Sequence, residues 1–152
     1  MAHNPVNHPA RPIYRAIGGL TGLYLVIFGV LGLIETGGNE AFAQDETTTV
    51  LGQGTNLGHS VLAVVLGMIV LIATGLGRNI DAAVNKWFGY LLMVVSLAGL
   101  AVIRTDANYL NFSIAGVVVT MIAGLVLLMA GMYGRVGSED EAQAWRDGRL
   151  VL

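Results

Sequence analysis

Cysteine is absent from this 152-residue sequence, and charged residues are scarce. The lack of cysteine excludes disulfide bonds, thiolate-ligated metal sites and cysteine nucleophiles. Asp, Glu, Lys and Arg together make up only 12% of the residues, and the net charge is -2. Because there is no basic block of the kind that binds nucleic acid, we expect no nucleic-acid partner.

The few charged residues leave four long stretches with no Asp, Glu, Lys or Arg at all. These stretches contain 19, 21, 17 and 26 residues and cover residues 16–34, 57–77, 87–103 and 109–134. A helix needs about 20 apolar residues, with a range of roughly 17–25, to cross the hydrocarbon core of a bilayer. The predicted fold class is therefore all-α, a polytopic membrane four-helix bundle. Its four-helix domain occupies residues 16–134, between tails at residues 1–15 and 135–152.

The absence of ionisable residues from the four stretches also bears on function. Proton pumps and ion-coupled transporters usually place ionisable groups near the middle of the membrane. The sequence also contains no Gly-rich nucleotide loop, no metal-binding histidine pair and no nucleophile motif. We therefore expect a protein that is not an enzyme and that carries no cofactor and no catalytic metal.

The positions of the cations predict an orientation in the membrane. Lys and Arg prefer cytoplasmic loops. If all four stretches cross the membrane, seven of the eight cations share one side with both chain ends, and only Arg104 lies on the other. We expect a multi-pass protein of the bacterial plasma membrane, with cytoplasmic N- and C-termini and an external acidic loop at residues 35–56.

Two pairs of segments in the sequence resemble each other. Residues 67–78 match residues 124–135 at a constant offset of 57, and the first and third stretches align at an offset of 71. Two tandem helical hairpins would make such a parallel repeat. Chance similarity between apolar segments explains the matches equally well, so both origins stay open.

Glycine is abundant, with 21 residues, and three glycines mark a candidate packing face on the first predicted helix. Gly18 and Gly22 have the spacing that lets transmembrane backbones approach closely. Gly29 lies farther along the same helix. This face packs either inside the bundle or against a helix of a partner.

Polar residues gather near the predicted outer ends of the helices. His59 lies one turn inside the second helix, and the loop between the third and fourth contributes Arg104, Asp106, Asn108 and Asn111. These five residues form a candidate polar rim. The rim either binds a ligand or stabilises its own turn, with an ion pair between Arg104 and Asp106. A bis-histidine haem is not expected, because His59 has no second histidine within the membrane.

Capping patterns predict two further helix ends. Asp106 or Asn108 is expected to cap the fourth helix. In the C-terminal tail, Ser138 and Glu141 have the spacing of a capping box, which predicts the start of a short helix.

Three segments carry a resemblance to a known family. They are Asn56-Leu-Gly-His, Arg104-Thr-Asp-Ala-Asn-Tyr-Leu-Asn-Phe-Ser and Gly124-Leu-Val-Leu-Leu-Met-Ala-Gly-Met-Tyr-Gly-Arg-Val-Gly. The sequence resembles, over residues 15–137, the bacterial membrane family called domain of unknown function 4383, which is common in actinobacteria. The resemblance implies a four-helix integral protein of the plasma membrane. It supplies no activity, ligand or catalytic residue.

Two functions are compatible with these features. The leading hypothesis is a non-enzymatic accessory or scaffold subunit that associates with a larger membrane complex. Its expected partners are the lipid bilayer and either another membrane protein or further copies of the chain in a homo-oligomer. The alternative is a small transporter, or a lipid- or solute-binding membrane protein with an outward-facing polar site. An aqueous cavity leading inward from His59 and Arg104 would favour this alternative, whereas a solid bundle with an exposed Gly/Ala face would favour association.

Overall fold

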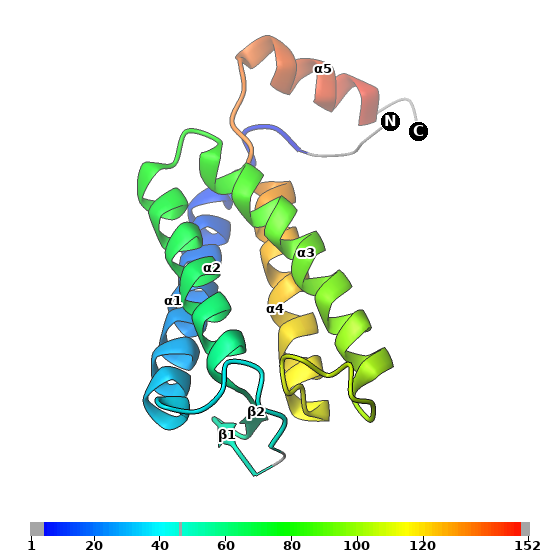
Figure 1. Cartoon of the computed structure of the whole chain (residues 1–152). Helices are drawn as coiled ribbons and strands as arrows, with labels where there is room; N and C mark the ends of the chain where they lie inside the picture. The colour runs from blue at the N-terminus through cyan, green and yellow to red at the C-terminus, as the bar shows by residue number, and fades with distance from the viewer. Residues whose placement is uncertain (1–4, 46, 150–152) are drawn as a thin grey trace.

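Four long helices dominate the computed structural model, which describes residues 5–45 and 47–149 (Figure 1). All four are long and apolar enough to cross a membrane, which confirms the predicted all-α four-helix architecture of a multi-pass membrane protein. The described elements are α1 (Arg11–Thr36), β1 (Thr49–Val50), β2 (Gln53–Gly54), α2 (Leu57–Leu76), α3 (Ile80–Val102), α4 (Ile114–Tyr133) and α5 (Glu139–Arg149). The predicted tails extend beyond the described residues at both ends, and Glu46 of the acidic loop also lies outside them.

The long helices form two hairpins that lie side by side, as Figure 1 shows. Helix α1 packs mainly on α2, and α3 packs mainly on α4. Each hairpin contains a close approach between two glycines. A methyl group on Gly67 would lie 2.6 Å from the carbonyl oxygen of Gly22, and one on Gly124 would lie 3.0 Å from that of Gly89. Small residues allow such contact between membrane helices, so the bundle consists of two tandem helical hairpins.

The two ends of the bundle differ in what closes them (Figure 1). We call the end that carries the α1–α2 loop, residues 37–56, and the α3–α4 loop, residues 103–113, the loop end. We call the opposite end, where α1 begins, α4 ends and α2 turns into α3, the terminal end. The antiparallel pair β1–β2 lies at the loop end, with Val50 paired to Gln53.

Helix α3 begins at Ile80, seven residues before the predicted start at residue 87. The turn that precedes it is tight because Gly77, Arg78 and Asn79 all have positive φ angles, of 64°, 50° and 69°. Such a left-handed run reverses the chain within a few residues. The longer helix takes Asp81 into its first turn, where the predicted boundary had left it in a loop.

Helix α4 begins at Ile114, five residues after the predicted start at residue 109. The residue that caps it is Ser113, whose hydroxyl accepts a hydrogen bond from the backbone N–H of Gly116 at 3.1 Å. The expectation that Asp106 or Asn108 caps this helix is therefore wrong. The Asn108 side chain instead accepts from the N–H of Phe112 at 2.8 Å and so shapes the loop before the helix.

Helix α5 begins where the capping box predicts. The Ser138 hydroxyl accepts a hydrogen bond from the backbone N–H of Glu141 at 3.2 Å. The segment before α5 is tied to the chain start, because the Asn7 side chain both donates to and accepts from the backbone of Gly137, at 3.0 and 3.1 Å. The two ends of the described chain therefore meet beside the terminal end of the bundle.

Candidate functional site

The two loops at the loop end are fastened to each other by buried asparagine side chains. Asn56 caps α2 by accepting a hydrogen bond from the N–H of His59 at 2.9 Å. Its amide nitrogen donates to the carbonyl of Ala43 in one loop, at 3.1 Å, and to that of Tyr109 in the other, at 2.8 Å. One uncharged side chain thus satisfies backbone groups from both loops.

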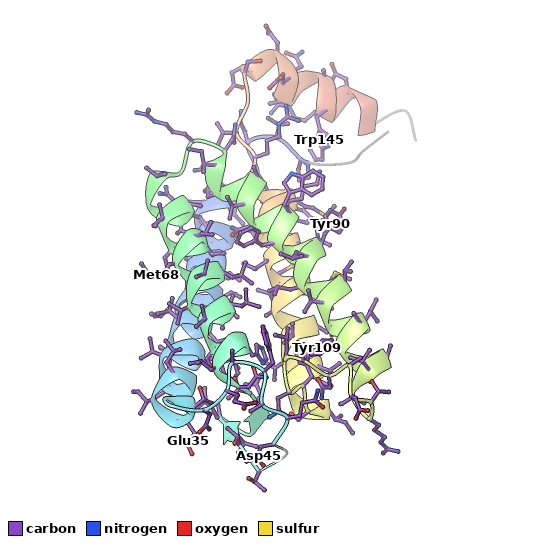
Figure 2. All side chains as sticks on the ribbon, in the orientation of Figure 1. Glu35, Asp45, Met68, Tyr90, Tyr109 and Trp145 are labelled. Carbon is purple, nitrogen blue, oxygen red and sulfur yellow. The ribbon has the colours of Figure 1, made fainter. Side chains whose placement is uncertain are left out.

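Asn111 makes a second connection of the same kind. Its amide nitrogen donates to the carbonyl of Asp45 at 2.7 Å and to that of Thr55 at 2.9 Å. Its φ angle is 51°, a left-handed conformation that asparagine tolerates better than most residues. Figure 2 labels Asp45 and Tyr109, which lie on the two loops at this end of the bundle. The loops therefore form one hydrogen-bonded cover over the helices.

Beneath this cover, a cavity of about 250 Å³ lies between the two hairpins. Its walls are mostly aliphatic and aromatic side chains from all four long helices, including Leu25, Leu66, Leu92 and Ala123. An engineered protein cavity of about 150 Å³ holds benzene. A volume of this size therefore has room for roughly ten non-hydrogen atoms. The polar side chains in the lining are few: Tyr24, Gln53, His59 and Thr120.

His59 contributes a hydrogen-bond acceptor to the cavity wall. Its ring nitrogen Nδ1 lies 3.1 Å from the carbonyl oxygen of Leu110, and because a carbonyl only accepts, Nδ1 carries the proton. The ring lies between Phe28 and Phe112, with centroid distances of 5.3 and 4.8 Å. None of the described residues that line the cavity is Asp or Glu, so a charged imidazolium would have no counter-charge there. The neutral ring leaves Nε2 as an acceptor.

Tyr24 contributes a hydrogen-bond donor to the same cavity. The amide nitrogen of Gln53 donates to the Tyr24 hydroxyl oxygen at 2.5 Å. This bond uses the oxygen as an acceptor and leaves the phenolic O–H able to donate. Gln53 comes from β2, so the small hairpin of the first loop places a polar side chain inside the bundle.

The five residues of the predicted polar rim occupy different environments. His59 lines the cavity, and Asn108 and Asn111 are buried in the loop cover. Arg104 and Asp106 are exposed, and no ion pair joins them in the part of the chain that the structure describes. Of the five rim residues, only His59 therefore lines the cavity, and the other polar residues that border the cavity are Tyr24, Gln53 and Thr120. The signal that could have found Tyr24 and Thr120 is weak, because single polar residues are common in membrane helices.

The predicted packing glycines face neighbouring helices inside the bundle. A methyl group on Gly18 would lie 2.5 Å from the amide nitrogen of Asn85. One on Gly22 would lie 2.8 Å from Val70, and one on Gly29 would lie 2.6 Å from the carbonyl oxygen of Ser60. All three glycines are buried within the single chain, so they allow α1 to approach α2 and α3.

A buried charge at the terminal end was missed from the sequence. Asp81 is 2% exposed, and one carboxylate oxygen lies 3.4 Å from Nη2 of Arg11 and 3.7 Å from Nε of Arg15. The Arg15 guanidinium also donates to the carbonyl of Thr74 at 2.8 Å. Because these contacts join α1, α2 and α3, the ion pair fastens the two hairpins together. The spacing of Asp81 and Asn85, one turn apart on α3, was the available signal.

Three oxygen atoms near this ion pair have no hydrogen-bond partner within residues 5–45 and 47–149. They are Oδ1 of Asp81, Oδ1 of Asn85 and Oγ1 of Thr74. Nowhere in the described part of the chain do three His, Cys, Asp or Glu side chains lie close enough together to hold a metal ion. The terminal end thus contains buried oxygen atoms without a hydrogen-bond partner, but its charged side chains, Asp81, Arg11 and Arg15, pair with one another.

Comparison with known proteins identifies the family. No curated protein and no solved structure matches the sequence. The family described as domain of unknown function (DUF4383) matches residues 15–133. This match spans both hairpins, including every residue named above as lining the cavity, and it confirms the resemblance seen in the sequence. The chain therefore belongs to the DUF4383 family.

Proposed function

We propose that this protein is not an enzyme and that it binds a lipid-soluble molecule in the cavity between its two hairpins. The observation that carries the proposal is the cavity itself, about 250 Å³ of space with apolar walls in a bundle of membrane-spanning helices. Small-molecule sites are typically apolar, with a few polar groups that orient the ligand. His59 and Tyr24 are placed to supply those groups.

The geometry supports this binding role better than the accessory or scaffold role predicted first. The scaffold prediction depended on a small-residue face that a partner helix could reach. Gly18, Gly22 and Gly29 are covered by other helices of the same chain, so that face gives no support to a partner. The cavity is apolar, unlike the aqueous cavity that a polar solute would need, which favours a lipid-soluble ligand. Association with another membrane protein or a second copy stays a prediction.

For orientation, we place both termini in the cytoplasm of a bacterial cell and the loop end outside the plasma membrane. The supporting feature is the cation asymmetry, with Arg104 alone at the loop end. The native chain has no cysteine, so single cysteines report position cleanly. A cysteine in place of exposed Leu51 should react with an impermeant thiol reagent on intact cells, and one in place of exposed Gln143 should not. The reverse pattern would invert the topology.

The binding role is tested with a diazirine-bearing alkyl chain added to phosphatidylcholine/phosphatidylglycerol vesicles that contain the protein. After illumination, mass spectrometry should find adducts on cavity residues such as Leu66 and Leu92. Ala63→Phe fills the cavity from α2, and we expect it to reduce those adducts at least fivefold. Ala123→Leu fills it from α4 and provides a second variant in case the first does not fold. Ala115→Phe, on an exposed position of α4, is the matched control.

Adducts restricted to the lipid-facing surface, unchanged by both filling variants, would contradict the binding role. A filling variant that stays folded also separates a loss of binding from a loss of structure. It adds apolar volume to the bundle without removing any polar contact. Thermal unfolding in detergent identifies which variants are folded.

A further inference from the structure

The cavity adjoins a depression on the outside of the bundle. This depression, the α1–α4 groove, has a volume of about 340 Å³ and is lined by side chains of α1 and α4 such as Ile17, Thr21 and Ile122. Tyr24, Val119 and Ala123 line both the groove and the cavity. These shared side chains lie between the inner space and a surface of α1 and α4 that would face lipid. A molecule dissolved in the bilayer would reach the cavity from this groove by passing the three shared side chains.

The hydrogen-bonding groups in the cavity restrict the chemistry of its ligand. Nε2 of His59 accepts, so the ligand has to present a donor to satisfy it. The O–H of Tyr24 donates, so the ligand also benefits from an acceptor. A hydroxyl group can donate a hydrogen bond to His59 and accept one from Tyr24 at the same time. A carboxylate or an ammonium group would be buried with no opposite charge among the described lining residues, which is costly.

Size indicates the rest of the ligand. The cavity holds roughly ten non-hydrogen atoms, by comparison with the benzene-sized engineered cavity, and the groove adds a longer apolar surface outside it. A compact ring would leave the groove unused. An unbranched or isoprenoid chain fits both spaces, with its polar end inside and its tail leading out between the helices.

We infer that the ligand is a neutral long-chain alcohol taken up from the bilayer through the α1–α4 groove. Its hydroxyl group binds at His59 and Tyr24, and its chain extends past Val119 and Ala123 into the groove. This inference rests on the proposed function and names the ligand class for the same cavity. Tyr24 has two tasks, since its ring forms part of the wall between groove and cavity and its hydroxyl faces the ligand.

Four probes that share one diazirine-bearing chain test the head group. They end in a hydroxyl, a methyl ether, a carboxylate or a methyl group, and each is added to phosphatidylcholine/phosphatidylglycerol vesicles that contain the full chain. The alcohol should label the cavity about tenfold more than the ether, because the ether leaves the buried acceptor of His59 unpaired. The carboxylate should label least.

Two variants assign the preference to named atoms. His59→Phe keeps an aromatic ring between Phe28 and Phe112 but removes both ring nitrogens, Nε2 and the Nδ1 that donates to Leu110. It should abolish the preference for the alcohol over the ether. Tyr24→Phe removes only the hydroxyl and should lower alcohol labelling about fivefold. Labelling by the hydrocarbon probe should change less than twofold in either variant, which shows that the cavity itself is intact.

A third variant tests the groove. Thr21 lines the groove but not the cavity, so Thr21→Phe should reduce alcohol labelling at least fivefold by displacing the chain. Val118→Phe, on an exposed position of α4 outside the groove, is the control. Unchanged labelling in Thr21→Phe would overturn the assignment of the chain to the groove.

The outcomes separate this inference from the proposed function. If all four probes label the cavity equally, the alcohol assignment is wrong and the binding role stands. If no probe labels the cavity, both are wrong. If the alcohol is preferred but His59→Phe retains the preference, the hydroxyl binds elsewhere and the assignment to His59 and Tyr24 fails.

Discussion

The loop end and the terminal end of this bundle both contain buried polar side chains, but they use different chemistry. At the loop end, Asn56 and Asn111 donate to backbone carbonyls of both loops. At the terminal end, Asp81 pairs with Arg11 and Arg15 across helices. One end is held by neutral amides and the other by charges.

This difference agrees with the position of the apolar cavity. Amides satisfy carbonyls without introducing charge, so the space beneath them can stay apolar at little electrostatic cost. A carboxylate and two guanidinium groups instead attract each other strongly in a medium of low dielectric constant and draw the helices together. Charged side chains therefore hold the helices together at the terminal end, whereas the apolar cavity lies toward the loop end, beneath the amide hydrogen bonds.

Of the changes that test this comparison, Asp81→Asn should cause the largest loss of stability. Removing one member of a buried ion pair costs about 3–5 kcal/mol, and the partial exposure of Arg11 and Arg15, 21% and 35%, places the expected loss near the lower limit, about 3 kcal/mol. Thermal unfolding in detergent measures it. Asp147→Asn, on an exposed position of α5, should change stability by less than about 0.5 kcal/mol. Equal melting temperatures for the two variants would show that the terminal end is not held by charge.

A smaller loss of stability is expected when a methyl group is added at either end of the packing face that Gly18, Gly22 and Gly29 form on α1. In Gly29→Ala, the new methyl would lie 2.6 Å from the carbonyl oxygen of Ser60, a backbone atom that cannot rotate away. In Gly18→Ala, it would meet the end of the Asn85 side chain, which can move. Overpacking costs about 1–3 kcal/mol, so we expect about 2 kcal/mol for Gly29→Ala and about 1 kcal/mol for Gly18→Ala. Guanidinium or thermal unfolding of both variants in one detergent makes the comparison, and the opposite order would contradict it.

The amide fastening of the loop end is tested at Asn111. Asn111→Gly keeps the freedom to adopt the positive φ angle but removes the two hydrogen bonds to Asp45 and Thr55. Leaving a buried acceptor unpaired costs about 1–3 kcal/mol. Since Asp45 is exposed and only Thr55 is fully buried, we expect about 1 kcal/mol. Hydrogen exchange should accelerate in both loops of Asn111→Gly, while the amides of α3 near Asp81 stay protected. Loss of protection at both ends of the bundle would show that the two ends are not independent.

The smallest effect concerns the pH dependence of the first loop. Hydrogen bonds from the side chain and backbone of Thr47, and from the Thr48 side chain, hold the pKa of Asp45 below its ordinary value. Because the folded pKa is the lower one, the stabilisation is complete above the ordinary value of about 3.9 and is lost as the pH falls to the lowered pKa. We expect the Thr47 amide to lose protection in that acidic range. Asp45→Asn should remove the pH dependence, and a wild-type loop that is insensitive to acid would contradict the assignment.

The sequence predicted most of the helices because their cause is local. Uncharged apolar runs must satisfy their own backbone hydrogen bonds in lipid, and a helix does so within one segment. The start of α5 was predicted for a similar reason, since Ser138 and Glu141 are only three residues apart. The start of α3 was missed because the predicted span was limited to the uncharged run that begins after Lys86, which left Asp81 in the loop. Its partners Arg11 and Arg15 lie about 70 residues away in the chain.

The candidate site was predicted only in part. His59 was identified because it is the one histidine near a span, but Arg104 and Asp106 were grouped with it through proximity in the loop and lie outside the cavity. Gln53 and Tyr24 gave no usable signal. Their meeting depends on how the β1–β2 hairpin folds into the bundle, and 29 residues separate them in the sequence.

The sequence by itself determined that the chain forms four helices long and apolar enough to cross a membrane and that it belongs to the DUF4383 family. The tertiary structure decided which faces meet, where the cavity lies and that Asp81 is buried. The physical reason is the solvent. In water, a polar face and an apolar face distinguish the outside of a helix from its inside. In lipid, the surroundings are as apolar as the core, so small residues and sparse polar contacts choose the packing, and their partners are distant in sequence.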